Sequence, residues 1–153
     1  KSFFIYMKKI TFIILLFSFT TTFSQCLSGN CKIGFGTYKY ENGSIYTGEW
    51  WNNEMNGEGT LIWPDGSVYV GEFKNGLYHG NGTYLNFKNS KTLYVGEFIE
   101  EMEDGYGTKI FENKDIYIGE LKEGKMNGFG TLIKKDGLIK EGHWKDNKPL
   151  NQM

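Results

Sequence analysis

Four glutamates recur along the chain at a nearly constant spacing, and they are its most regular groups capable of acid–base chemistry. They are Glu49, Glu72, Glu97 and Glu120. Two carboxylates hydrolyse a glycosidic bond only if their surroundings differ enough to keep one of them protonated. Identical residues in repeated surroundings lack that difference, so we expect structural glutamates that pair with Thr or Lys on a neighbouring strand. A strip that recognises cations is the functional alternative.

The remaining candidates for chemistry are weaker. The two histidines, His79 and His143, have no cysteine or serine motif beside them, so the sequence predicts neither a zinc site nor a catalytic triad. The Gly-x-Gly pieces of the chain resemble phosphate-binding loops only in their glycines, because no helical pattern follows them. We therefore predict a protein that is not an enzyme and that holds no metal and no cofactor.

The charged residues narrow the choice of partner. All 17 basic residues are lysines, and the formal net charge is −1. Leaving out residues 1–25 removes three lysines and no acid, so that 14 lysines face 18 acidic residues. A chain without arginine lacks the group best suited to bidentate phosphate recognition. It also has no basic surplus for nucleic acid or an anionic lipid surface, so we exclude nucleic acid as a partner.

Residues 1–25 have the order of a secretory signal peptide. Met7 is followed by a lysine pair, an apolar run at 10–19 and a mostly small, polar stretch that allows cleavage after Ser24. An uncleaved membrane anchor is the alternative, but this apolar run is short for a span, which needs about 20 residues. We interpret Met7 as the true start. We expect a secreted, periplasmic or cell-envelope protein, with membrane association as a further option.

Cys26 and Cys31 are the only cysteines. Two nearby thiols pair readily in an oxidising compartment, so a disulfide is the preferred interpretation. Two alternatives stay open: free thiols, and lipidation of Cys26. Lipidation is disfavoured because Gln25, the residue before that cysteine, is not small. A metal site is not expected, because two cysteines alone do not supply four ligands.

The strongest signal in the chain is an internal repeat with a period of 23 residues. The first half of the unit reads Tyr-x-Gly-Glu followed by a large apolar residue. It occurs at 46–50, 69–73, 94–98 and 117–121, with a more divergent copy at 140–144. The second half, Gly-x-Gly-Thr, occurs at 34–37, 57–60, 80–83, 105–108 and 128–131. One spacing of 25 residues instead of 23 places a two-residue insertion in the turn at 86–91.

Turn residues divide each unit into two strands. Asn-Gly or Asp-Gly pairs at 42–43, 65–66 and 136–137 favour two-residue hairpin turns, because such turns need positive φ angles. Asn75 and Gly76 mark a second kind of turn, between the halves of their unit. Each unit is therefore interpreted as one β-hairpin. A hairpin alone is marginal in water, so neighbouring hairpins must stack for stability.

Alternation along the strands puts the aromatic residues and the glycines of the first half-unit on one face. Glycine leaves room there for a ring or a neighbouring backbone. A single-layer sheet cannot hide both faces, so we predict that rings line a binding groove, as aromatic anchors do at interfaces. Rings that only stack on one another are the alternative. The candidates are Trp50, Trp63, Tyr69, Phe73, Tyr94, Phe98 and Tyr117.

The pattern Tyr-x-Gly-Glu-Trp followed by Gly-x-Gly-Thr, at this period, resembles the MORN (membrane occupation and recognition nexus) repeat. The resemblance covers about residues 33–148, with about four full and two partial repeats in a domain at 26–153. It implies an all-β fold: an elongated single-layer antiparallel sheet of stacked hairpins with a shallow groove. It also implies a binding or scaffold role and an affinity for phospholipids. Leu121 and Lys140 depart from the pattern, and we interpret 140–153 as a polar cap.

These observations predict a non-enzymatic, extracytoplasmic binding or scaffold module whose partner is a protein or another component of the cell envelope. Binding to a phospholipid surface is the alternative, although the missing arginine and the net acidity argue against an anionic surface. The terminal strands also leave main-chain donors and acceptors open, which permits edge-to-edge self-association.

Overall fold

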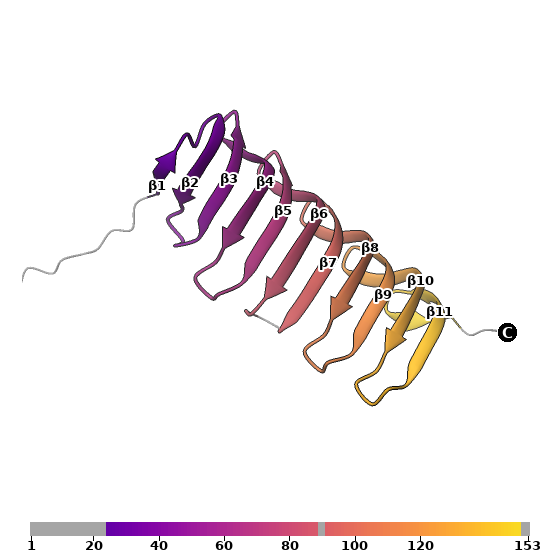
Figure 1. The fold of residues 1–153 in the computed structure, drawn as a ribbon. Helices are drawn as coiled ribbons and strands as arrows, with labels where there is room; N and C mark the ends of the chain where they lie inside the picture. The colour runs from indigo at the N-terminus through magenta and orange to yellow at the C-terminus, as the bar shows by residue number, and fades with distance from the viewer. Residues whose placement is uncertain (1–23, 89–90, 151–153) are drawn as a thin grey trace, which may run out of the picture.

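The computed structural model describes residues 24–88 and 91–150, and these residues form one open antiparallel sheet (Figure 1). Every strand pairs with its neighbours in sequence, so the described strands run from β1 to β12 in chain order. They are β1 (Gln25–Gly29), β2 (Gly34–Lys39), β3 (Ile45–Trp51), β4 (Glu54–Ile62), β5 (Val68–Lys74), β6 (Leu77–Asn86), β7 (Thr92–Ile99), β8 (Met102–Ile110), β9 (Ile116–Lys122), β10 (Lys125–Ile133), β11 (Ile139–Lys145) and β12 (Lys148–Pro149). The predicted all-β, single-layer sheet of hairpins is confirmed. The predicted signal peptide, up to residue 23, lies outside the described residues.

Two kinds of connection alternate along the sheet. Within a hairpin, a two-residue turn joins the strands, and both turn residues have positive φ angles, as a type I′ turn requires. Asn75 and Gly76 form one such turn. Glu100 and Glu101 form another, with φ angles of 49° and 69°, although neither is a glycine. Turns of this kind also occur at 52–53, 123–124 and 146–147.

The prediction of two-residue turns at 42–43, 65–66 and 136–137 is wrong. These pairs lie inside five-residue loops between hairpins, and only the glycine of each pair has a positive φ angle. In the first of these loops Gly43 donates its N–H to the Tyr40 carbonyl, and the Ser44 N–H donates to Asn42 Oδ1. The Asn or Asp therefore stabilises the loop through its side chain, while the glycine supplies the left-handed residue.

The two-residue insertion lies where the spacing predicts it, but it does not lengthen the loop. β6 ends at Asn86 and β7 begins at Thr92, which is the same separation as between the other hairpins. Each of these two strands is instead one residue longer than its counterparts, and Asn86 pairs with Thr92 in the extra step. The β6–β7 strand pair is therefore one residue pair longer than the corresponding strand pairs of the other repeats.

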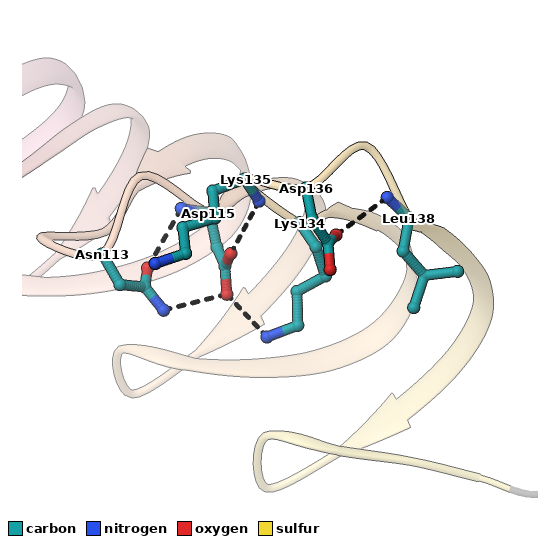
Figure 2. Close-up of polar contacts among 6 residues, drawn as sticks. All are labelled: Asn113, Asp115, Lys134, Lys135, Asp136 and Leu138. Atoms are coloured by element: carbon teal, nitrogen blue, oxygen red, sulfur yellow. Dashed lines mark hydrogen bonds and ion pairs between the residues drawn. The ribbon is translucent and has the colours of Figure 1, made fainter.

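Neighbouring loops are tied together by a buried polar residue at one repeated position. Figure 2 shows the example between the β8–β9 and β10–β11 loops, where Asp115 accepts bonds from Lys134 Nζ at 2.6 Å and from the Lys135 N–H at 3.0 Å. The bond from Lys134, and then the bond from the Lys135 N–H, lower the pKa of Asp115. Ser67 has the same place in an earlier loop, and its hydroxyl accepts the Phe87 N–H. These contacts fix the loop ends of successive repeats to one another.

A bulge interrupts four of the hairpins, from β3–β4 to β9–β10, at the same point. In the β5–β6 hairpin, Glu72 faces three residues, 79–81, where a regular ladder would place one. Gly80, in the middle of the three, has a φ angle of 60°, which favours glycine. The same shift occurs in the β3–β4, β7–β8 and β9–β10 hairpins. Because bulges bend a strand pair, the ends that carry the two-residue turns curve away from the rest of the sheet (Figure 1).

The tyrosine and the glutamate of the Tyr-x-Gly-Glu motif each bond a main-chain group at the bulge. Tyr69 donates its hydroxyl hydrogen to the Glu72 carbonyl at 2.9 Å, and Glu72 Oε1 accepts the Asn81 N–H at 2.8 Å. Equivalent bonds occur around Tyr94 and Tyr117. The repeated glutamates are therefore structural, as expected, but in these repeats their partner is a main-chain N–H rather than a Thr or Lys side chain.

The tyrosine ring lies against a pair of glycines that face each other across the hairpin. Gly71 pairs with Gly82, and a Cβ atom at Gly82 would overlap the Tyr69 ring. Rings also meet from repeat to repeat: the Phe73 centroid lies 4.9 Å from that of Tyr46. The rings form one continuous core along the described part of the chain.

The two ends of the sheet are short strands. β1 has five residues, and β12 has two. In β11, Lys140 is exposed at the place where the other repeats bury a tyrosine. Short edges limit pairing with another chain, and edge-to-edge self-association stays a prediction.

Four tyrosines should keep their protons well above the pH at which tyrosine ordinarily ionises. Burial is the first cause that raises the pKa of Tyr46, Tyr69 and Tyr94 well above 10.0, and it raises that of Tyr117 to about 12. Since the folded pKa exceeds the unfolded one, the stability contributed by the neutral hydroxyls is complete below pH ~10 and is lost as the pH rises further. We expect tyrosinate absorbance from these residues to appear only as the circular dichroism of the sheet disappears. Ionisation of every tyrosine near pH ~10 in the folded chain, as in the denatured one, would contradict this.

Candidate functional site

Six of the seven rings predicted to line a groove are buried instead. They are Trp50, Tyr69, Phe73, Tyr94, Phe98 and Tyr117, none more than 6% exposed. The expected exposure is wrong for these six, because the bulge turns the hairpin ends over the face that strand alternation alone would leave open. Only Trp63 is half-buried, packed against the edge of the core.

We call the face on which these six rings are buried the inner face of the sheet. A different set of residues lines a hollow along it. A pocket of about 430 Å³ has Trp63, Tyr78 and Tyr84 in its walls. A second pocket, of about 750 Å³, shares Tyr84 with the first. A third, of about 350 Å³, shares Phe111 and Met126 with the second. We name these three connected pockets the inner groove.

The inner groove is lined by positions at which the repeats differ. The residue after Gly-x-Gly-Thr is Leu61, Tyr84, Lys109 or Leu132 in successive repeats. Two residues further on, the chain has Trp63, Asn86, Phe111 or Lys134. The second residue of the second strand is Met55, Tyr78, Glu103 or Met126. Positions that stay constant serve the bulge and the core, so the groove is where each repeat carries its own chemistry.

One repeat places an ion pair in the groove where the others place apolar or aromatic pairs. Glu103 and Lys109 lie 2.5 Å apart, with their side chains 14% and 15% exposed. The corresponding residues are Tyr78 with Tyr84, and Met126 with Leu132. Burial raises the pKa of Glu103, against the opposing effect of Lys109. A buried ion pair stabilises a fold no better than a well-packed apolar pair, so the fold alone does not require this ion pair.

Lys109 is held in a fixed position within the groove. Its Nζ also donates to the Gly124 carbonyl at 3.4 Å and lies 5.8 Å from the centre of the Phe111 ring. A cation near a ring face is attracted by the ring's quadrupole. The groove floor therefore presents an ordered charge pair between aromatic side chains.

A fourth pocket, of about 560 Å³, lies at the N-terminal end of the sheet. Cys26 and Cys31 form a disulfide in its wall, and Tyr38, Tyr40 and Trp50 also line it. Burial raises the pKa of Tyr40. The disulfide fixes the β1–β2 connection that closes this pocket.

The histidines do not join any candidate site. His143 takes the place of the repeated glutamate and packs edge-on against Phe129, with ring centroids 5.4 Å apart. Across residues 24–88 and 91–150, no cluster of three or more His, Cys, Asp or Glu side chains could hold a metal ion. The same residues include no helix long and apolar enough to cross a membrane.

The rings proposed from the sequence do not include Tyr78, Tyr84 and Phe111, because all of those proposed except Trp63 belong to the recurring motif. Regular recurrence marks residues that every hairpin needs for its own fold. The signal that finds the groove is the opposite one: an inward-facing position whose residue type changes from repeat to repeat.

A family model described as the MORN repeat matches residues 34–45, 46–68, 69–89, 94–116 and 117–139. Four of the matched segments begin at the tyrosines that donate to a main-chain carbonyl at the bulge, Tyr46, Tyr69, Tyr94 and Tyr117. No curated protein matches the chain in sequence.

Replacing the ion pair tests whether it serves the groove or the fold. The double variant Glu103→Met and Lys109→Leu copies the fifth repeat, so its free energy of unfolding should be unchanged or higher by about 1–4 kcal/mol. The single variant Lys109→Leu leaves Glu103 unpaired and should lose roughly 3 kcal/mol in urea unfolding at neutral pH. If the double variant is as unstable as the single one, the pair is structural and its assignment to recognition is wrong.

Proposed function

The chain belongs to the MORN-repeat family, and from that membership and the inner groove we propose that it is a non-enzymatic, extracytoplasmic module that binds a protein or another cell-envelope component. MORN repeats form binding and scaffold modules. The observation that carries the proposal is the contrast between a constant scaffold and a variable groove. A purely structural array would have no reason to replace an apolar pair by Glu103 and Lys109 at one repeat.

The location outside the cytoplasm is supported by two features. The order of charged, apolar and small residues at 7–24 is that of a secretory signal. The disulfide between Cys26 and Cys31 is of a kind that persists in oxidising compartments and is rare in the cytosol.

The groove offers little to an anionic phospholipid surface. It has no basic surplus, because its walls contain four carboxylates and four lysines, and two of the lysines, Lys109 and Lys134, are paired with Glu103 and Asp115. The chain contains no arginine. Phospholipid binding therefore stands as the alternative to be separated by experiment, through salt-sensitive binding to anionic vesicles.

Photo-crosslinking in living cells tests the proposal. A photoreactive phenylalanine analogue at Phe111 faces the groove, whereas the same analogue at Phe129, whose side chain is 45% exposed, lies outside it. We expect an adduct with an envelope component from position 111 and none from position 129, formed by a chain that has lost residues 1–24. Equal adducts from both positions would contradict a groove function. Adducts formed only in the cytoplasm by the uncleaved chain would contradict the location.

A further inference from the structure

We propose that the groove between the second and fourth repeats binds a proline-rich segment in the polyproline II conformation that carries a basic residue. This inference rests on the proposed groove function and names the chemistry of its ligand. Four observations support it: the arrangement of three rings, their unused hydrogen-bond donors, the spacing of the repeats, and the local charge.

The three rings are Trp63, Tyr78 and Tyr84. Their centroids are 5.8 to 6.2 Å apart, and Trp63 meets both tyrosines edge-on, at interplanar angles of 68° and 80°. Pro64 and Asn86 complete the walls of the same pocket of about 430 Å³. Aromatic-lined grooves of this kind accept proline rings, because a polyproline II segment enters them already ordered.

The polar atoms of these three rings make no hydrogen bonds among the described residues, in contrast to those of the core tryptophans. The Trp50 and Trp144 indoles donate to the carbonyls of Gly36 and Gly130. Within residues 24–88 and 91–150, the Trp63 indole N–H has no hydrogen-bond partner, and the Tyr78 and Tyr84 hydroxyls have none either. No fully buried side-chain polar atom in that part of the chain is unsatisfied. These three polar atoms are therefore reached by solvent in part, although burial is the first cause that raises the pKa of Tyr78 and of Tyr84.

Three free donors beside aromatic faces suit a ligand that offers acceptors. A polyproline II segment makes no internal hydrogen bonds, and proline has no N–H, so its carbonyls are open. A glycan would present hydroxyls, which donate as well as accept. The Trp63 indole N–H only donates, whereas the Tyr78 and Tyr84 hydroxyls both donate and accept, so all three can donate to the open carbonyls of the peptide. Hydrogen bonding alone does not separate the peptide from a glycan, whereas the spacing of the repeats favours the peptide.

The spacing along the groove agrees with this ligand. Successive repeats are two strands apart, which is about 9.6 Å. One turn of polyproline II is three residues and rises about 9.3 Å. A segment that runs along the row therefore brings a residue of the same register to each repeat, from the pocket at Trp63 to the pocket at Phe111, which shares Tyr84.

The charge near the rings selects a basic residue in the ligand. After burial, the carboxylates of Asp65, Glu101 and Glu103 are among the groups that raise the pKa of Tyr78 or Tyr84, so they act on the pocket through space. Lys109 is paired with Glu103. Lys88 lies in the pocket wall and acts on Asp65, so Glu101 is the one of these three carboxylates that has no lysine beside it among the described residues. A lysine or arginine of the ligand would neutralise the remaining negative charge near the rings.

Titration of the mature chain with designed peptides tests the inference. The probe is a blocked peptide with proline at every third position and one lysine, and its matched control has alanine in place of each proline. We expect the tryptophan fluorescence of the protein to change with the first peptide, and at least about tenfold tighter binding than for the second. Trp63→Ala should weaken binding at least about tenfold, whereas Tyr106→Ala, a 58% exposed ring on the opposite face, should leave binding unchanged.

Tyr84→Phe keeps the inference testable if Trp63→Ala fails to fold. It removes a hydroxyl that has no partner among the described residues, so the free energy of unfolding should not change, whereas peptide binding should weaken about fivefold. Equal affinity for both peptides, or unchanged binding by Tyr84→Phe, would overturn the proposal. Binding of a soluble oligosaccharide that depends on Trp63, without peptide binding, would overturn it in favour of a glycan. Groove cross-links from Phe111 would then still support the proposed function.

Discussion

The structure depends on how each hairpin satisfies the bulge in its own ladder. At that point a glutamate faces three residues, and a tyrosine hydroxyl and a glutamate carboxylate bond the carbonyl and N–H there. The first of these bonds is part-buried and the second is exposed, so the cost of roughly 1–3 kcal/mol for a fully buried main-chain group without a partner is an upper bound for each. The same step needs glycine twice, once for a left-handed φ angle at Gly80 and once for the ring that lies on Gly82. Tyr, Gly and Glu recur because this one arrangement requires all of them.

The bulge also creates the surface on which we expect function. It bends the turn-bearing ends of the hairpins out of line with the rest of the sheet (Figure 1). The regular rings are buried, and the pockets of the inner groove lie between repeats. Because the scaffold contacts use the constant positions, the inward-facing positions beside them are free to vary. In the last copy, Lys140 and His143 replace the tyrosine and the glutamate, and only the two-residue β12 follows in the described chain.

The architecture could be predicted from the sequence because the repeat motifs act on the main chain. The period and the antiparallel pairing of neighbouring strands follow from the spacing, and the structure has both. Alternation also places Tyr46, Gly48 and Trp50 on one face correctly. It cannot show that a three-residue bulge bends that face closed, which is why Tyr69 and Phe98 are core residues. Nor does an Asn-Gly pair reveal its turn type, since Asn42 and Asn75 belong to different turns. Tyr84 and Glu103 were missed because they interrupt the pattern.

A double-mutant cycle between Tyr69 and Gly82 tests the central claim most directly. Gly82 does not have a left-handed φ angle, and the three atoms nearest to a methyl group there all belong to the Tyr69 side chain. We predict that Gly82→Ala alone lowers the free energy of unfolding by about 1–3 kcal/mol. In a Tyr69→Leu background the same substitution should cost little, because the ring is gone. An equal cost in both backgrounds would contradict the account, since the glycine would then be required for a reason other than the tyrosine.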